Sequence, residues 1–333
     1  MRNALKNDTL RQALYAAALP QLILLCSCAR EDLNWLIGDP INVVATTEPA
    51  TRSGDNIQTA NFDDGAEINA YYNTTVGEQV LGKNPTILTA SAAEAGKNRL
   101  RPDVQPYYPQ TGTVDIMALY PRTTATKGIT SFTVKPDQQD ESNYKLSDLM
   151  WAGVTSQAKT TSDVNLQFSH MMAKMSVTVT GKEGVLIKSV KIVNVQRSIS
   201  ISALSASACT LGAIGTETDT EILLASTSNT TVNNKLSGSV LFPPQTISGN
   251  FIEVETNYKD IAGYTYFSVI DKEFKSGKEY SANLVVKRQD IGFVTTITDW
   301  ENNGGSIAVP PGSSAGFRIV STQKSVRGKD SWN

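Results

Sequence analysis

The sequence contains few of the side chains that most often carry out chemistry. Its 333 residues include one histidine, His170, and three cysteines, which are Cys26, Cys28 and Cys209. Zinc sites are built from clusters of histidine and cysteine, and histidine is the usual partner of a catalytic serine or cysteine. These counts argue against a metalloenzyme and a histidine-dependent protease. We therefore predict no catalytic residue, no metal site, no cofactor and no enzymatic activity.

Charge is also scarce and nearly balanced. Lysine and arginine number 30 against 32 acidic residues, which gives a formal net charge of −2. Domains that bind nucleic acid carry a clustered excess of positive charge, so we expect no nucleic-acid partner. Hydrophobic residues make up 40% of the chain, enough to form a core. At roughly 100–200 residues per domain, the length is typical of two domains.

No apolar run is long enough to cross a bilayer as a helix. The run at residues 13–25 falls short of the roughly 20 residues that a spanning helix needs, and it follows a basic segment, as in a signal peptide. It ends in LCSC at residues 25–28, which resembles a bacterial lipobox. The resemblance implies a lipoprotein signal peptide at residues 1–27 and acylation (palmitate) of Cys28. The alternative is an ordinary secretory signal.

Short runs of β-branched and aromatic residues, separated by Gly, Pro, Asn and Asp, dominate the rest of the chain. Such runs predict an all-β protein built from antiparallel β-sandwiches. We expect one short surface helix, at the alanine-rich residues 90–97. Apolar residues change parity between 164–168 and 171–179, which predicts a break near Ser169 and His170. We interpret His170 as a packed structural residue rather than a catalyst.

The polar segment at residues 154–162 is the best candidate for a junction between domains. The predicted division is an N-terminal β-sandwich domain at 28–160, a C-terminal β-sandwich domain at 161–309 and a tail at 310–333.

Six local patterns follow one another along the chain. They are VDIMALYP (114–121), SDLMWA (147–152), LQFSHMMAKM (166–175), FPPQ (242–245), GKEY (277–280) and ITDW (297–300). As an ordered set after a lipobox, they resemble the Bacteroidales fimbrillin-like (Mfa-like) family, the lipoprotein subunits of proteinase-matured (type V) pili. The resemblance implies two tandem antiparallel β-sandwich domains of transthyretin-like topology.

The resemblance also implies a route of assembly. In polymerising members an arginine-specific protease cuts a loop near the N-terminus, and the first strand leaves with the lipid anchor. The matching bond here joins Arg52 to Ser53, in the polar loop at residues 46–59. The exchangeable strand that precedes this loop lies at residues 41–45 and contains Ile41, Val43 and Val44.

In such members, a terminal strand of a neighbouring subunit then fills the vacated groove. The 310–333 tail contains a short strand-like piece with three apolar residues, Phe317, Ile319 and Val320. The tail is therefore a candidate donor strand.

Three functions stay open at this point. The favoured one is a structural subunit (stalk, tip or accessory) of a surface fimbria, with other fimbrial subunits, an arginine-specific protease and the outer membrane as partners. The second is a non-polymerising surface lipoprotein adhesin that binds a glycan, a host ligand or a bacterial surface ligand. The third is an all-β hydrolase, for which acidic residues would have to supply an acid and base pair; the candidates are Asp63, Asp64, Glu67, Asp137, Asp140 and Glu141.

Overall fold

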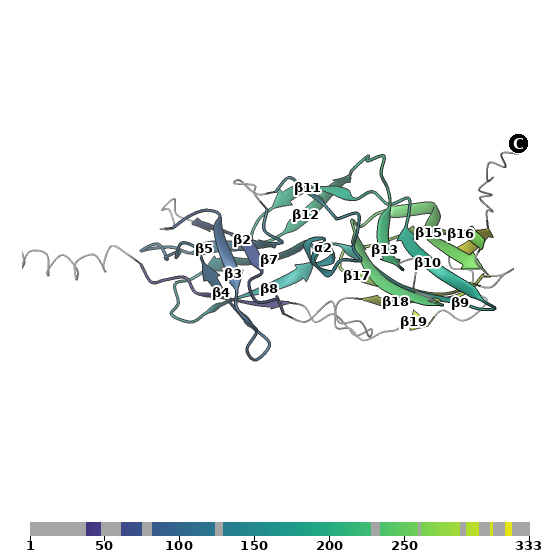
Figure 1. Cartoon of the computed structure of the whole chain (residues 1–333). Coiled ribbons are helices and arrows are strands. Elements are labelled where there is room, and N and C mark those ends of the chain that lie inside the picture. Colours follow the sequence, from purple (N-terminus) through teal and green to yellow (C-terminus); the bar gives the residue numbers. More distant parts are fainter. Residues whose placement is uncertain are drawn as a thin grey trace, which may run out of the picture.

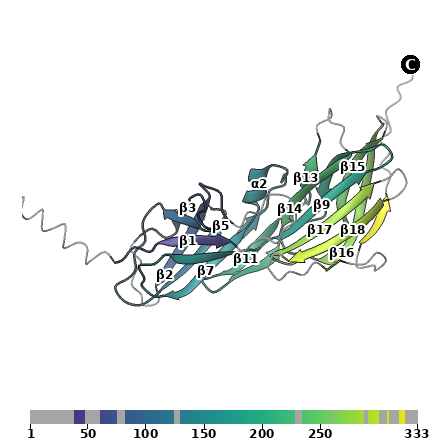
Figure 2. The same ribbon diagram turned by 90° about the horizontal axis from the view of Figure 1, so that it is seen from below.

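The protein is described by a computed structural model that covers residues 38–47, 61–74, 82–123, 129–227, 234–258, 261–286, 291–299, 307–308 and 317–321. The predicted signal peptide with Cys28 and the predicted cleavage point at Arg52 and Ser53 lie outside these ranges. The molecule is elongated, with two groups of strands toward its two ends (Figures 1 and 2). In the described part of the chain, no helix is long and apolar enough to cross a membrane.

The first group of strands forms a closed barrel with the order β1-β4-β3-β2-β5-β7-β8. Neighbouring strands pair antiparallel except for β1 and β8, which are parallel. The strands are β1 (Val43–Thr47), β2 (Glu67–Thr74), β3 (Thr86–Ala90), β4 (Asn98–Pro102), β5 (Val114–Tyr120), β7 (Met150–Gln157) and β8 (Val164–His170).

These findings confirm the all-β class and modify its detail. A sandwich was expected here, but β1 hydrogen-bonds to β4 on one side and to β8 on the other, and this double pairing closes the sheet into a barrel. The boundary expected between residues 160 and 161 precedes β8, so the strands of the barrel continue to His170. Inside the barrel, alternate side chains of each strand form one apolar cluster, as the two-residue period of a strand requires.

The second group contains two five-stranded sheets and a three-stranded sheet. The orders are β13-β10-β15-β16-β20, β14-β9-β17-β18-β19 and β12-β11-β6. The strands are β6 (Ser131–Thr133), β9 (Ala173–Gly181), β10 (Val185–Ile192), β11 (Ser198–Leu204), β12 (Cys209–Ile214), β13 (Ile222–Ser226), β14 (Lys235–Phe242), β15 (Thr246–Tyr258), β16 (Ile261–Glu273), β17 (Lys278–Val286), β18 (Ile291–Asp299), β19 (Ile307–Ala308) and β20 (Phe317–Ser321).

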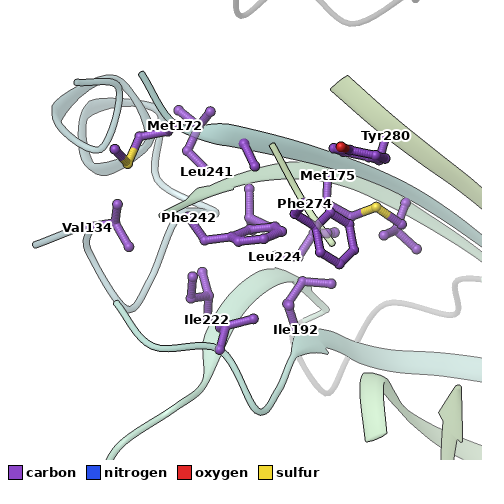
Figure 3. Packing of buried hydrophobic residues seen from close by; sticks show 14 of the residues in the cluster. Val134, Met172, Met175, Ile192, Ile222, Leu224, Leu241, Phe242, Phe274 and Tyr280 are labelled. Carbon is purple, nitrogen blue, oxygen red and sulfur yellow. The ribbon is translucent and has the colours of Figure 1, made fainter. Parts of the chain in front are cut away.

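The two five-stranded sheets share a core. Met175 of β9, Ile192 of β10 and Phe242 of β14 belong to one buried cluster, which Figure 3 shows from close by. The rings of Phe242 and Phe274 meet nearly edge to face, with centroids 5.1 Å apart. Such packing of large apolar side chains between two sheets is what holds a sandwich together.

The chain passes from the barrel to the second group at Met171 and Met172, between the end of β8 and the start of β9. This position confirms the break predicted from the change of parity. At the same junction, the indole N–H of Trp151 donates a hydrogen bond to the carbonyl oxygen of Ser205 at 3.2 Å. The strands of the barrel and of the three-stranded sheet are therefore tied together by a direct contact.

The prediction of a helix at residues 90–97 is wrong. This segment is the turn of the β3–β4 hairpin, in which Glu94 and Lys97 exchange backbone hydrogen bonds and Gly96 has a φ of +77°. Hairpin pairing overrides the helix propensity of a few alanines. The described helix is α2 (Glu141–Leu146), where the Asp140 side chain caps the first turn by accepting a hydrogen bond from the Asn143 N–H.

Candidate functional site: the leading segment and its groove

The leading segment, defined here as residues 41–47, fills a groove between two strands that lie far away in sequence. Val43 is the partner of Leu100 in β4 and of Val164 in β8. Ahead of β1, the Ile41 N–H donates to the carbonyl oxygen of Pro106 at 2.8 Å, and the Val164 N–H donates to that of Asn42 at 2.8 Å. Both edges of the segment are thus satisfied by backbone hydrogen bonds.

The side chains of the leading segment alternate between two environments. Ile41, Val43 and Ala45 point into the barrel core and are 1%, 2% and 0% exposed. Asn42 between them is exposed. Burying a branched aliphatic side chain stabilises a protein by about 1.5–3 kcal/mol, so this short segment contributes several kcal/mol to the barrel.

The leading segment is attached to the barrel by one covalent connection. The next strand in the chain, β2, is three places away in the barrel order β1-β4-β3-β2. No hairpin therefore joins β1 to either strand with which it pairs. A cut between β1 and β2 would leave β1 held by noncovalent contacts alone.

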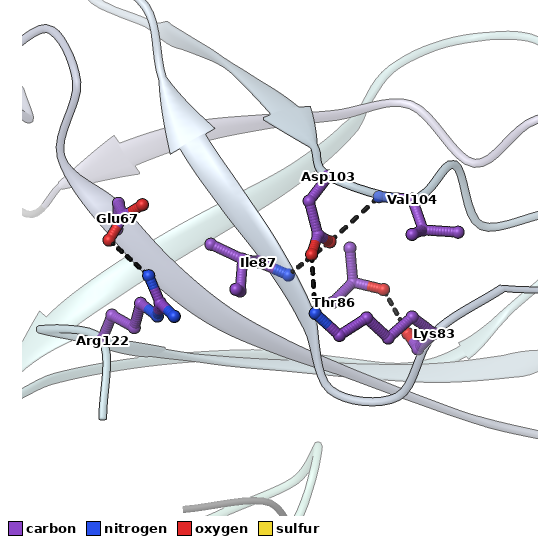
Figure 4. A network of polar contacts seen from close by, with 7 residues as sticks. All are labelled: Glu67, Lys83, Thr86, Ile87, Asp103, Val104 and Arg122. Carbon is purple, nitrogen blue, oxygen red and sulfur yellow. Dashed lines mark hydrogen bonds and ion pairs between the residues drawn. The ribbon is translucent and has the colours of Figure 1, made fainter. Parts of the chain in front are cut away.

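The strand beside the leading segment is fixed by a polar network around Asp103, just after β4 (Figure 4). One carboxylate oxygen accepts hydrogen bonds from the N–H groups of Ile87 and Val104, both at 2.9 Å, and the other accepts from Lys83 Nζ at 2.7 Å. Partial burial alone would raise the pKa of Asp103, but these hydrogen bonds outweigh it and hold the pKa below its usual value.

A small pocket of about 50 Å³, here called the Thr47 pocket, lies at the C-terminal end of the leading segment. His170 Nδ1 and Asp148 Oδ1 are 2.9 Å apart in its wall, and both side chains are at least 90% buried. His170 is therefore a packed residue, as predicted. The lining residues are Thr47, Asn61, Phe62, Asp63, Tyr120, Tyr144, Lys145, Asp148, Met150 and His170.

Two hydroxyl groups of the Thr47 pocket are buried without a hydrogen bond. Among the described residues, neither Thr47 Oγ1 nor the Tyr144 hydroxyl has a partner. Tyr144 is 1% exposed, and burial raises its pKa well above the ordinary value. A buried polar atom without a partner lowers stability, so the resident strand leaves this pocket imperfectly filled.

Three of the acidic residues considered for hydrolysis form structural contacts in the described part of the chain. Glu67 pairs with Arg122 at 2.8 Å and Asp63 with Lys145 at 2.6 Å. Asp140 caps α2. No group of three histidine, cysteine, aspartate or glutamate side chains within the described ranges is arranged to hold a metal ion.

The segment predicted as a donor strand lies at the other end of the molecule. Phe317, Ile319 and Val320 belong to β20, which pairs antiparallel with β16 as the last strand of its sheet. The backbone of β20 is hydrogen-bonded to a neighbouring strand on one side, and that neighbour is β16. The structure therefore separates the candidate donor from the groove of its own chain (Figure 2).

A family model described as fimbrillin-like matches residues 31–300. The chain belongs to the fimbrillin-like family. The resemblance carried by the six ordered patterns is thereby confirmed. No curated protein matches the chain.

Solved structures with TM-scores above 0.5 share the fold of this fimbrillin-like chain. A candidate cell adhesion protein from Bacteroides uniformis is 19% identical, with a TM-score of 0.58 over 78% of this chain and 98% of that chain. Another from Bacteroides ovatus is 16% identical, with a TM-score of 0.55 over 80% of this chain and 99% of that chain. The tip fimbrial protein Mfa3 from Porphyromonas gingivalis, C-terminally truncated, is 11% identical, with a TM-score of 0.47 over 78% of this chain and 100% of that chain.

Membership of the family supports a fimbrial or adhesion-related role in a cell-surface appendage, in association with other fimbrial subunits. It indicates a structural rather than an enzymatic protein. The sequence did not predict the Thr47 pocket, because its walls come from five separate stretches of the chain and follow no motif.

Proposed function

We propose that this chain is a structural subunit of a surface fimbria and that the leading segment is exchanged during assembly. In this proposal, acylation of Cys28 anchors the subunit to the outer membrane, and cleavage between Arg52 and Ser53 cuts the connection between β1 and β2. A strand from a neighbouring subunit then takes the place of β1. The observation that carries the proposal is the position of β1, which pairs on both edges and yet has no hairpin to either partner.

The physical reason for exchange lies in what β1 leaves behind. Without it, the facing edges of β4 and β8 present unpaired N–H and C=O groups, and the apolar pockets of Ile41, Val43 and Ala45 open to water. Both are unfavourable. A donated strand corrects both at once, because its backbone supplies the hydrogen bonds and its alternate side chains fill the pockets.

The 310–333 tail is long enough to serve as that donor. Fully extended, its 24 residues span at most about 80 Å at roughly 3.3 Å per residue. This length exceeds the dimension of a barrel of this size, so reach does not limit donation to a neighbouring subunit.

The proposal is tested by limited proteolysis of the purified, lipid-free protein with an arginine-specific protease. We expect cleavage at Arg52 followed by a ladder of multimers on unboiled denaturing gels. The matched control is Arg52→Lys, which removes the cleavage site, retains the charge and should give monomers. Mass spectrometry verifies that Arg318 and Arg327 in the tail stay intact. Cleavage at Arg52 that yields stable monomers would refute the exchange.

A second candidate function rests on a surface hollow of about 790 Å³ beside β1. Val44, Arg99, Arg101 and Asp163 line it together with further polar residues, so it offers charges of both signs to a polar ligand. A non-polymerising adhesin would use this hollow for a glycan or a host ligand. Saturable binding on a glycan array that Arg101→Ala abolishes, without any ladder after cleavage, would favour this reading.

A further inference from the structure

The surface hollow beside β1 is centred on a row of three basic side chains and is here called the β4 hollow. Lys97, Arg99 and Arg101 occupy alternate positions along β4 and the turn before it, next to β3 (Figure 1). All three side chains are exposed, as alternate residues on the outer face of a strand are. A strand rises about 3.3 Å per residue, so the row presents positive charge over about 13 Å.

Little of this positive charge is neutralised within the protein. Arg99 Nη2 lies 3.6 Å from Asp163 Oδ2, a loose pair in which 67% of the arginine side chain is exposed. In the part of the chain that the structure describes, Lys97 and Arg101 form no ion pair. Exposed charges of this kind contribute little to folding stability, so stability does not account for the row. The row is open to an anionic ligand.

The walls of the β4 hollow are fixed from behind by Asn98, whose side chain is fully buried. The Asn98 amide oxygen accepts from the Phe62 N–H at 2.8 Å. The amide nitrogen donates to the carbonyl oxygens of Phe62 at 2.9 Å and Ser91 at 2.7 Å. Nearby, the Gly65 N–H donates to the carbonyl oxygen of Ala90 at 2.8 Å. These bonds set the shape of the hollow before a ligand arrives, which lowers the entropic cost of binding.

The chemistry of the walls selects among anionic ligands. None of the described residues that line the hollow is aromatic, so it lacks a flat apolar platform for a neutral sugar ring. Asp64, Glu94 and Asp163 also line it, and their carboxylates accept hydrogen bonds without donating any. These three residues repel a ligand of dense negative charge and favour one that supplies many donors. The hydroxyl groups of a sugar are such donors.

We propose that the β4 hollow binds a carboxylated glycan, a sugar chain of the uronic-acid type. Its carboxylates lie on the basic row, where each arginine fork matches the two oxygens of a carboxylate. Its hydroxyl groups donate to the acidic residues of the walls, and Val44 of β1 supplies an apolar part of the floor. The inference names the ligand class of the hollow and does not depend on strand exchange.

The ligand class is tested by isothermal titration of the purified, lipid-free, uncleaved protein. The probe is a trimer of galacturonic acid, and the matched control is its methyl ester, which keeps the rings and most hydroxyl groups but has no charge. We expect saturable binding of the acid that weakens as the salt concentration rises, and no measurable binding of the ester. Sulfated dextran and hexaglutamate, which lack either carboxylates or sugar hydroxyl groups, should bind more weakly than the acid.

The site is tested by single substitutions. Lys97→Ala and Arg101→Ala should each weaken binding of the galacturonate about tenfold, the effect of losing one charge-assisted hydrogen bond. The matched control is Lys182→Ala, which removes the same charge from an exposed turn between β9 and β10 and should bind like the wild type. All three side chains are exposed, so thermal unfolding should be unchanged, and this measurement checks that each variant is folded.

The acidic walls are tested by Glu94→Gln. Removing this like charge should raise the affinity for sulfated dextran about threefold, the scale of one exposed charge interaction. An unchanged affinity would show that the walls do not select against dense charge.

The remaining outcomes separate this inference from the proposed function. Equal binding of the acid and its ester, or tighter binding of sulfated dextran or hexaglutamate, overturns the ligand class. Undiminished binding in Arg101→Ala overturns the site. A protein that forms the multimer ladder after cleavage and yet binds no galacturonate refutes this inference alone. A protein that binds galacturonate and forms no ladder refutes strand exchange alone.

Discussion

Ile41 should be one of the largest contributors to the stability of the barrel, although it lies ahead of β1. Its side chain is 1% exposed and packs in the core cluster of the barrel. Ile41→Ala removes three buried carbon atoms and leaves a cavity, which lowers the free energy of unfolding by about 3 kcal/mol. With an m-value near 3 kcal/mol/M, the urea midpoint of the barrel falls by about 1 M.

The matched control is Asn42→Ala. Asn42 is exposed, and its contribution to the groove is a backbone carbonyl that alanine retains. We expect a change below about 0.5 kcal/mol. The assay is equilibrium urea unfolding followed by far-UV circular dichroism. Equal midpoints for the two variants would show that the leading segment does not belong to the cooperative unit of the barrel, and the reasoning on strand exchange would lose its basis.

Three further predictions concern titratable groups. Asp103→Asn should destabilise the protein by about 1 kcal/mol at pH 7; because the folded pKa is lowered, the difference from the wild type should shrink in urea unfolding as the pH falls below about 4. Burial raises the pKa of the Cys209 thiol to about 11, so a thiol reagent at pH 8 should modify it far more slowly in the folded than in the unfolded protein. Glu279 pairs with the buried Lys174 at 3.2 Å, so Glu279→Ala leaves that lysine without its partner and should lower the free energy of unfolding by about 3–5 kcal/mol. Glu273 pairs with Lys275 on the surface, and Glu273→Ala should change the free energy of unfolding little.

The strands could be predicted from the sequence because their signals are local. Residues 114–120 form a short, mainly apolar run between turn signals, and they coincide with β5. The change of parity around Ser169 and His170 marks the end of β8 because each strand must turn its apolar face toward its own core. Both features depend on neighbours in sequence, so one chain suffices to find them.

Helix α2 and the Thr47 pocket could not be predicted from local sequence signals. α2 has local signals, with the cap Asp140, the acidic Glu141 in its first turn and the basic Lys145 in its last, but six residues are too few for a helical period to appear. In the Thr47 pocket, His170 and Asp148 are 22 residues apart and Thr47 comes from a distant strand. Only the three-dimensional pairing of β1 with β8 brings these groups together.

The pairing that closes the barrel also bears on the proposed exchange of β1. The strands from β4 to β8 form a continuous antiparallel series in which β3 pairs with β4 and β7 with β8. β1 joins the two ends of that series without setting the register of any other pair. Its departure would open the barrel into a sheet of the six remaining strands and leave every other ladder intact. Removing β5 would also leave a sheet of six strands, but β5 lies between the barrel strands β4 and β7 along the chain and could leave only after two cuts, whereas one cut between β1 and β2 would separate β1 from the other barrel strands.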